Sequence, residues 1–238
     1  MDAKDIPVNI QRTALQWVRA NRKKLNVTFC DPLDYKDEPY PSTTFMAGTP
    51  GAGKTEFSKS LVGTFDHHIV RIDADEIREM MREIGYNGKN ASLFQRAVGA
   101  AVNNMYGYVL KKRQSVVIDG TFAYGNWREN IERSLQNNRL VEIYYLYQEP
   151  EVAWNFVKQR EQKQGRVVPG DVFIHDYYAS IENVTKAKEV FGEKLQIYFA
   201  KHNYKKEVEY VIVNIKKVEE HLPKMYTKEE LREIIIHA

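Results

Sequence analysis

Residues 43–55 read Thr-Thr-Phe-Met-Ala-Gly-Thr-Pro-Gly-Ala-Gly-Lys-Thr, and this stretch decides the fold. Its second half fits the pattern G-x-x-x-x-G-K-[ST], in which glycines let backbone N–H groups surround an anion without side-chain clashes. Residues 43–47 predict a strand, and residues 54–61 predict a helix whose N-terminus faces the same anion. The stretch therefore predicts a phosphate-binding loop made of Gly48, Thr49, Pro50, Gly51, Ala52, Gly53, Lys54 and Thr55.

Two side chains of this loop have predicted roles. Lys54 is expected to reach the β- and γ-phosphates of a nucleotide, and the hydroxyl of Thr55 is expected to ligate Mg²⁺. A GTPase would also need the base-reading sequence N-K-x-D further along the chain, which is absent. We therefore expect ATP and Mg²⁺ as cofactors, with GTP as an alternative nucleotide. The competing interpretation is a plain glycine turn followed by an exposed lysine.

The rest of the chain alternates short apolar runs with helical patterns. Helices are predicted at residues 8–24, 54–61, 75–85, 91–112, 126–137, 150–164 and 172–191. Strands are predicted at residues 43–47, 68–72, 115–118, 141–147, 195–200 and 208–215. Continuous β-branched runs between helices indicate parallel strands buried on both faces. The predicted fold class is α/β, a P-loop NTPase fold with a doubly wound, mostly parallel sheet and helices on both faces.

Two further segments flank this pattern. We expect an N-terminal helix with an extended, proline-containing arm, a P-loop kinase domain and a C-terminal helical appendage, over residues 1–42, 43–215 and 216–238. In the appendage, Thr227-x-x-Glu230 has the pattern of a capping box at a helix N-terminus. The apolar residues Leu231, Ile234 and Ile235 then fall on one face of that helix.

The composition is that of an ordinary globular protein. Of 238 residues, 43% are hydrophobic and 28% are charged, with a formal net charge of +3. Lys and Glu are interspersed, so a nucleic-acid partner is not expected. Cys30 is the only cysteine, which excludes an internal disulfide and fits a reducing cytoplasm. No signal peptide is recognisable, and no apolar stretch approaches the ~20 residues of a membrane span. We expect a cytoplasmic protein without a membrane partner.

Carboxylates follow the second predicted strand. Asp73 and Asp75 lie at its end, beside the crevice in which open sheets bind ligands. Asp75 could accept the proton of an acceptor hydroxyl as that hydroxyl attacks the γ-phosphate, and Asp73 is the second candidate. The structural alternative is that these acids cap the helix starting at Glu76, because Asp73-x-x-Glu76 resembles a capping box. Both roles can coexist.

The third predicted strand ends in Asp119-Gly120-Thr121. An apolar run followed by a carboxylate is typical of a Walker B strand, so Asp119 is expected to orient Mg²⁺ or its water. Gly120 permits close approach, and Thr121 offers a hydroxyl to the substrate. The alternative is a strand that simply ends in a turn.

Two arginines flank a flexible stretch after the predicted helix 150–164. Arg160 and Arg166 suit a lid that closes over the transferring phosphate, because Arg donors neutralise the charge that develops on its oxygens. The alternative is a pair of surface arginines.

In this order, the motifs resemble those of the zeta toxins and their P-loop kinase relatives. The matching pieces are FMAGTPGAGKTEFSK, IDADEIR, VVIDGTF and QREQKQGRVVP, within residues 43–185. The resemblance implies an ATP-dependent phosphotransferase acting on a hydroxyl of a small molecule. In well-studied members the acceptor is UDP-N-acetylglucosamine or a related UDP-sugar, and an antitoxin protein commonly holds the enzyme in check.

The resemblance also assigns roles to residues. It makes Lys54 the phosphate lysine, Asp75 the catalytic base, and Arg160 and Arg166 the phosphate-binding arginines.

Two other positions depart from the family pattern. Thr121 is similar to the substrate-contacting threonine of the family's E-G-T, but Asp119 replaces the glutamate. The family's substrate-binding glutamate, counted back without gaps from Thr121, falls on Asn103, which bears on specificity for a UDP-sugar.

Two alternative functions remain at this stage. A polynucleotide or tRNA-end kinase would need a basic groove with interleaved aromatics, for which residues 201–206 are the candidate. A nucleotide-dependent switch or binding module would keep the loop but would need neither Asp75 nor the arginine lid.

Overall fold

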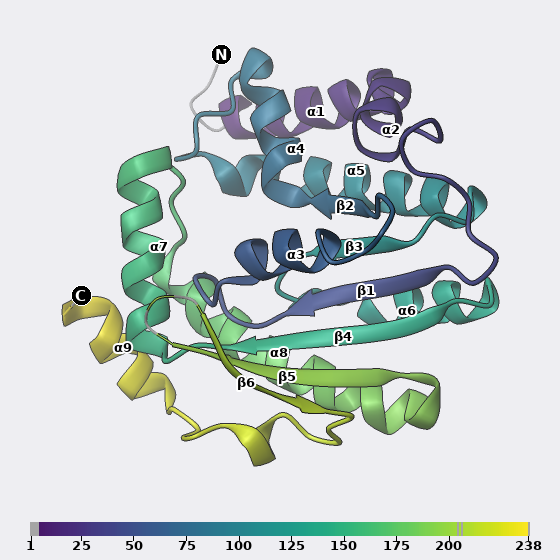
Figure 1. Ribbon diagram of the computed structural model, residues 1–238. Coiled ribbons are helices and arrows are strands. Elements are labelled where there is room, and N and C mark those ends of the chain that lie inside the picture. The colour runs from purple at the N-terminus through teal and green to yellow at the C-terminus, as the bar shows by residue number, and fades with distance from the viewer. Residues whose placement is uncertain (1–4, 204, 206, 238) are drawn as a thin grey trace.

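The computed structural model describes residues 5–203, 205 and 207–237, and within them six strands form one sheet (Figure 1). The strands are β1 (Ser42–Ala47), β2 (Val70–Asp73), β3 (Val116–Asp119), β4 (Leu140–Tyr147), β5 (Gln196–His202) and β6 (Val208–Val213). Their order is β2-β3-β1-β4-β5-β6, and β6 runs antiparallel to β5 while the other neighbours are parallel. This confirms the predicted α/β fold with a mostly parallel sheet.

Helices lie on both faces of the sheet (Figure 1). One face is covered by α5 (Ala91–Lys111), α6 (Trp127–Gln136) and α8 (Gly170–Phe191), and the other by α3 (Lys54–Val62). Near β2 lie α1 (Asp5–Ala20), α2 (Arg22–Cys30), α4 (Ala74–Met80) and the 3₁₀ turn η1 (Met81–Ile84). The remaining elements are α7 (Pro150–Gln164), η2 (Gly192–Lys194), η3 (Glu219–His221) and α9 (Lys228–His237). No helix in the described ranges is both long and apolar enough to cross a membrane.

Three predicted boundaries are wrong, each for a local reason. The helix predicted over residues 8–24 is two helices, because Asn21 between them leaves the helical conformation, with φ −97° and ψ 14°. The helix predicted over 75–85 ends as α4 and continues as η1, which stops at Gly85 in the left-handed region. The strand predicted over 208–215 stops at Val213, because Asn214 has a φ of 57°.

One apolar core connects segments that are far apart in the sequence. Buried residues of α1, β1, β4 and α8 belong to a single cluster, which also includes Leu231 of α9. The capping box before α9 is confirmed: the Glu230 N–H donates to Thr227 Oγ1 at 3.2 Å, and the Thr227 N–H donates to the Glu230 carboxylate at 2.8 Å. The division into segments 1–42, 43–215 and 216–238 stays a prediction.

The carboxyl ends of β1, β2 and β3 meet at one edge of the sheet. Gly48 follows β1, and the register pairs Asp73 at the end of β2 with Asp119 at the end of β3. All four residues of β3 are buried, as expected of a central parallel strand. The sheet therefore brings the phosphate-binding loop and the two predicted acids to the same edge.

Candidate functional site

The phosphate-binding loop has a backbone shape that requires glycine at two positions. Gly48 has a φ of 124°, and a Cβ there would lie 2.2 Å from the carbonyl oxygen of Leu146. Gly51 has a φ of 81°, and a Cβ there would lie 2.1 Å from the carbonyl oxygen of Ala153. The glycines of the motif are therefore needed both for the turn and for its contact with β4 and α7.

Lys54 is the first residue of α3 and is buried under its own loop. Its Nζ donates hydrogen bonds to the carbonyl oxygens of Gly48, at 2.9 Å, and Thr49, at 2.5 Å. Burial lowers the pKa of Lys54 to about 8, although the negative charges of Asp119 and Asp176 oppose this. Asp176, on α8, is a neighbour that the sequence did not predict. The lysine is thus poised beside the loop, where an anion would favour its charged form.

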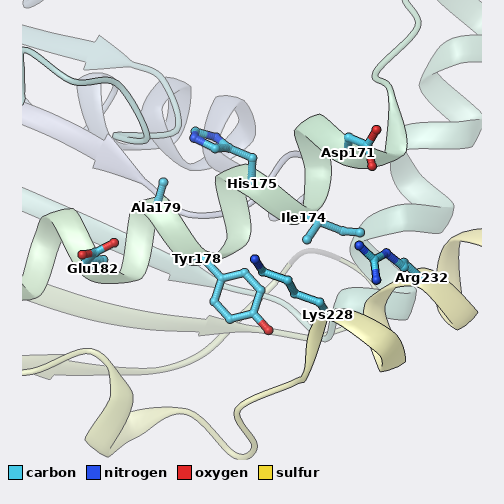
Figure 2. Close-up of a pocket in the computed structure, with 8 residues that line it drawn as sticks. All are labelled: Asp171, Ile174, His175, Tyr178, Ala179, Glu182, Lys228 and Arg232. Carbon is cyan, nitrogen blue, oxygen red and sulfur yellow. The ribbon is translucent and has the colours of Figure 1, made fainter.

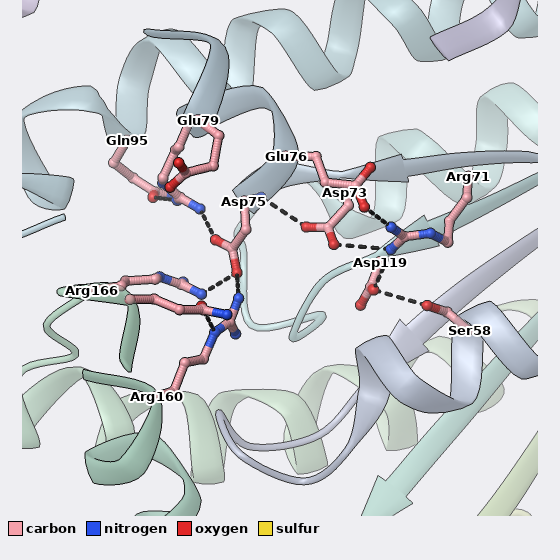
Figure 3. Close-up of polar contacts among 12 residues, drawn as sticks. Ser58, Arg71, Asp73, Asp75, Glu76, Glu79, Gln95, Asp119, Arg160 and Arg166 are labelled. Atoms are coloured by element: carbon pink, nitrogen blue, oxygen red, sulfur yellow. Dashed lines mark hydrogen bonds and ion pairs between the residues drawn. The ribbon is translucent and has the colours of Figure 1, made fainter. Parts of the chain in front are cut away.

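Asp75 is the centre of an arginine cluster built from distant segments (Figure 3). Its Oδ2 accepts a hydrogen bond from Arg160 Nη2 at 2.6 Å and another from Arg166 Nη1. Its Oδ1 accepts one from Arg78 Nη1 at 2.6 Å. Burial by itself would raise the pKa of Asp75, but the three arginines together outweigh it and hold that pKa below its usual value. The carboxylate is therefore ionised at neutral pH.

A backbone contact fixes the segment that carries Arg166. After α7, Gly165 adopts a φ of 73° and turns the chain. Gly88, in the loop between η1 and α5, has a φ of 82°, and a Cβ there would lie 2.5 Å from the carbonyl oxygen of Gly165 and 3.0 Å from the Arg166 nitrogen. Two glycines thus let the backbones touch directly beside the arginine.

A second acid cluster surrounds Arg71 (Figure 3). Arg71 Nη1 donates to Oδ2 of both Asp73 and Asp119, each at 2.9 Å, and its Nη2 donates to Glu76. Ser58 Oγ, from α3, also donates to Asp119 Oδ2 at 2.9 Å. Burial and the neighbouring charge of Asp73 raise the pKa of Asp119, although Ser58, Lys54 and Arg71 oppose the shift.

Asp73 also caps α4, as the structural alternative predicted. The Asp75 N–H donates to Asp73 Oδ1 at 2.7 Å, and the helix begins at Ala74 rather than at Glu76, where the capping alternative began it. The reciprocal half of a capping box is not formed by Glu76, whose carboxylate pairs with Arg71 instead. Capping by one oxygen of Asp73 leaves its other oxygen in the Arg71 cluster.

Comparison with known proteins identifies the family of this chain. Residues 28–217 match the family model described as zeta toxin. The chain belongs to the zeta toxin family. A structure from the PezAT chromosomal toxin–antitoxin system of Streptococcus pneumoniae is similar to it over 92% of each chain, with 14% identity and a TM-score of 0.66.

A complex named AvrRxo1-ORF1:-ORF2 with ATP matches 86% of this chain and 66% of its own, with 14% identity and a TM-score of 0.60. No curated protein sequence is detectably similar to this chain. The fold of these neighbours and the membership of the zeta toxin family support a nucleotide-using kinase.

The remaining residues predicted from the loop motif or from the family resemblance lie in different places. Thr55 is half-buried in the first turn of α3, next to Lys54. Thr121 is half-buried, and its carbonyl oxygen accepts a hydrogen bond from the Gly48 N–H at 3.2 Å, so it adjoins the loop. Asn103 is exposed on α5, and its Oδ1 accepts a hydrogen bond from Arg133 at 2.6 Å.

Asn103 is displaced along α5 from the Asp75 cluster. Gln95 of the same helix contacts Arg78 at that cluster, and Asn103 follows eight residues later, or about 12 Å along the helix axis at 1.5 Å per residue. The structure thus brings together the loop, Asp73, Asp75, Asp119 and the two lid arginines, and it places Asn103 beside Arg133.

Four contributors to the two clusters were not predicted from the sequence. Arg78 follows Asp75 by three residues on one helix, a spacing that brings side chains together and could have indicated it. Arg71 and Ser58 act only through the packing of β2 and α3 against β3, and Gln95 acts through the packing of α5 against α4. These last contacts had no local sequence signal.

A separate hollow lies between α8 and α9 (Figure 2). Its volume is about 350 Å³, and its walls carry both acids and bases, among them Asp171, Glu182, Lys228 and Arg232. None of the predicted site residues lines it. We therefore place the candidate site at the sheet edge, where the loop, acids and arginines converge.

Proposed function

We propose that this member of the zeta toxin family is an ATP-dependent kinase that transfers the γ-phosphate to a hydroxyl of a small molecule. The observation that carries the proposal is the contact of Asp75 with Arg160 and Arg166, at the sheet edge that also holds the glycine loop. An ionised carboxylate and two arginines beside a phosphate cradle are the groups that phosphoryl transfer needs.

In the proposed reaction, the loop N–H groups and Lys54 hold the ATP phosphates. Asp75 takes the proton of the acceptor hydroxyl as the hydroxyl oxygen bonds to the γ-phosphorus. The bond from the γ-phosphorus to the β–γ bridging oxygen breaks, and ADP leaves with that electron pair. Arg160 and Arg166 neutralise the charge on the transferring group. To do this, they release Asp75 and donate hydrogen bonds to phosphate oxygens instead.

Mg²⁺ is the proposed metal, held by Thr55 and, through water, by Asp119. No group of three or more His, Cys, Asp or Glu side chains within the described ranges could hold a metal by itself. This fits Mg²⁺, which usually keeps several waters and binds one or two protein oxygens plus substrate phosphates. Asp119, whose Oδ2 already accepts hydrogen bonds from Ser58 and Arg71, would hold a water of the ion through its carboxylate. When bound, the ion neutralises charge on the β- and γ-phosphates.

The acceptor that we propose is a nucleotide sugar such as UDP-N-acetylglucosamine, contacted by Asp73 and Thr121. Asn103, in the position of the family's glutamate, is the third proposed contact. Its present bond to Arg133 would have to be exchanged for the acceptor, so it is the weakest of the three. An antitoxin partner is proposed by analogy with PezAT, which is a toxin–antitoxin system, and the cytoplasm is the proposed compartment.

The test is ADP release with Mg²⁺–ATP against a panel of nucleotide sugars, nucleosides and RNA ends. We expect stimulation by a UDP-sugar and no stimulation by RNA ends. The matched control is Lys54→Ala, which should abolish transfer and keep the fold, because the hydrogen bonds that its ammonium group donates within the described residues go to carbonyl oxygens of its own loop. Full activity of a folded Lys54→Ala protein would end the kinase proposal, and slow turnover that no acceptor stimulates would favour a nucleotide-dependent switch.

A further inference from the structure

We propose that Arg78 is a positioning residue that holds Asp75 Oδ1, so that Oδ2 is the oxygen that receives the acceptor's proton. This inference rests on the proposed kinase function and deepens it. It assigns different tasks to the three arginines around one carboxylate.

The side chain of Arg78 is buried and hydrogen-bonded on two sides. Arg78 lies one turn after Asp75 on α4, and its side chain is only 6% exposed. Its Nη1 donates to Asp75 Oδ1 at 2.6 Å, and its Nη2 donates to Gln95 Oε1 on α5. Within the described part of the chain, its buried Nε has no hydrogen-bond partner. The guanidinium is therefore held between Asp75 and Gln95, and it ties the carboxylate to the packing of α4 on α5.

The two lid arginines are different in each of these respects. Both contact Oδ2 rather than Oδ1, and their side chains are 38% and 25% exposed. They come from the end of α7 and from the segment after Gly165, which are far from α4 in the sequence. Phosphate oxygens carry more charge than one carboxylate and compete for these same donors. Binding of ATP therefore draws the lid arginines away from Oδ2.

Removal of the lid arginines leaves one contact on the carboxylate. Arg78 then fixes the rotation of the carboxyl group through Oδ1, and Oδ2 becomes available for the acceptor hydroxyl. A proton acceptor must lie within about 2.6–3.2 Å of the proton's oxygen, so a carboxylate that rotates freely would spend less time in reach. Arg78 thus supplies orientation, and it also supplies the positive charge that keeps Asp75 ionised in the nucleotide complex.

The charged groups around Asp75 come from two sides. Asp73, the N-cap of α4, and Arg78 lie on its own helix, and Arg160 and Arg166 approach from the α7 side. Tyr86, after η1, lies near enough to Arg78, Arg166 and Asp75 to interact electrostatically with them. With the lid arginines on phosphate, Arg78 is the closest cation left on Asp75.

The test compares Arg78→Met with the conservative Arg78→Lys and with the control Arg82→Met. ADP release is measured across pH with UDP-N-acetylglucosamine as the acceptor probe, and ATP Kd is measured alongside. We expect Arg78→Met to lower kcat about 100-fold, the effect of a misplaced reacting group. The acid limb of kcat should move up by about 1–3 pH units, the usual influence of one adjacent Arg on an Asp. ATP Kd should change little.

The two other variants separate charge from position. Arg78→Lys keeps a positive charge but cannot bridge Asp75 and Gln95 with a fork of donors. Its acid limb should stay near that of the unchanged protein while kcat falls. Arg82→Met removes an exposed arginine that pairs with Glu79, and it should leave both quantities unchanged. Normal kcat in Arg78→Lys, or a normal acid limb in folded Arg78→Met, overturns the proposal.

A readout without turnover keeps this result distinct from failure of the kinase proposal. The Asp75 carboxyl carbon is titrated by ¹³C NMR with Mg²⁺ and a non-hydrolysable ATP analogue present. We expect its pKa to rise by about 1–3 units in Arg78→Met relative to the unchanged protein. The rise should be smaller without the analogue, because Arg160 and Arg166 then remain on Oδ2. An equal rise in both states contradicts the departure of the lid arginines, and no rise in either state rejects Arg78 as the holder.

Discussion

The two acid clusters at the sheet edge are held by different kinds of neighbour. Asp75 is surrounded by arginines of which two come from a distant, half-exposed segment. Asp73 and Asp119 share Arg71, whose side chain is 10% exposed and lies on the same sheet. In the proposed reaction, Arg160 and Arg166 leave Asp75 when phosphate binds, whereas Arg71 stays with its two acids on the sheet. On this proposal, the first carboxylate is released for chemistry and the second pair keeps its cation.

The largest expected effect comes from breaking the first cluster alone. Asp75→Asn is nearly isosteric, but the amide is a far weaker proton acceptor, so kcat should fall by about 10²–10⁴-fold with ATP Kd little changed. The matched variant Asp73→Asn keeps a good N-cap residue on α4 and should lower kcat less than about tenfold. Measurement of kcat and ATP Kd on both variants decides between them. A larger loss of kcat in Asp73→Asn than in Asp75→Asn would identify Asp73 as the base and contradict the distinction between the two clusters.

The second cluster should respond mainly in stability. Arg71→Met leaves the buried Asp73 and Asp119 without their shared cation, and loss of one partner from a buried pair costs about 3–5 kcal/mol of unfolding free energy at pH 7. The control Arg82→Met removes an exposed pair with Glu79, for which about 0–1 kcal/mol is expected. Urea unfolding measures both. Equal, small losses would show that Arg71 is as replaceable as a surface arginine.

The pH dependence of the Arg71→Met loss has a definite sign. The pKa of Asp119 is already raised in the folded protein, and removal of Arg71 would raise it further. A carboxyl group whose folded pKa lies above its unfolded pKa destabilises the fold while it is ionised, so the cost is complete above the folded pKa. The loss should therefore be smaller at pH 5 than at pH 7. The same loss at both pH values would place the cost elsewhere than on Asp119.

The smallest effect on the chemistry is expected from α9, which belongs to neither cluster. Truncation before Thr227 removes the capping box and the buried Leu231. Loss of the burial of one such side chain costs about 1.5–3 kcal/mol, so the melting temperature should drop while ATP Kd stays unchanged. Calorimetry and nucleotide titration of the truncated protein provide the measurement. A folded, truncated protein that no longer binds ATP would show that α9 contributes to the nucleotide site.

Much of this architecture was predictable because it is encoded locally. The glycine loop and the apolar runs before Asp73 and Asp119 predicted which strands end beside one another, since parallel strands share an edge. The lid interpretation assigned Arg160 and Arg166 to the transferring phosphate, but it did not foresee that both would contact Asp75. Arg71 could not be assigned in this way, because its partners depend on the register of β2 with β3, which no single segment contains. An ungapped count to Asn103 likewise could not foresee its bond to Arg133 on another helix.

The contact between Gly88 and Gly165 limits which substitutions the chain can accept at position 88. Any side chain at position 88 would force its Cβ against the backbone that leads into Arg166, and the positive φ adds strain of its own. A substitution at position 88 is therefore tolerated only if the backbone around Gly165 and Arg166 adopts a different conformation. In a library of variants, position 88 should behave like a residue of the loop that carries Arg166, although 77 residues of chain lie between the two positions.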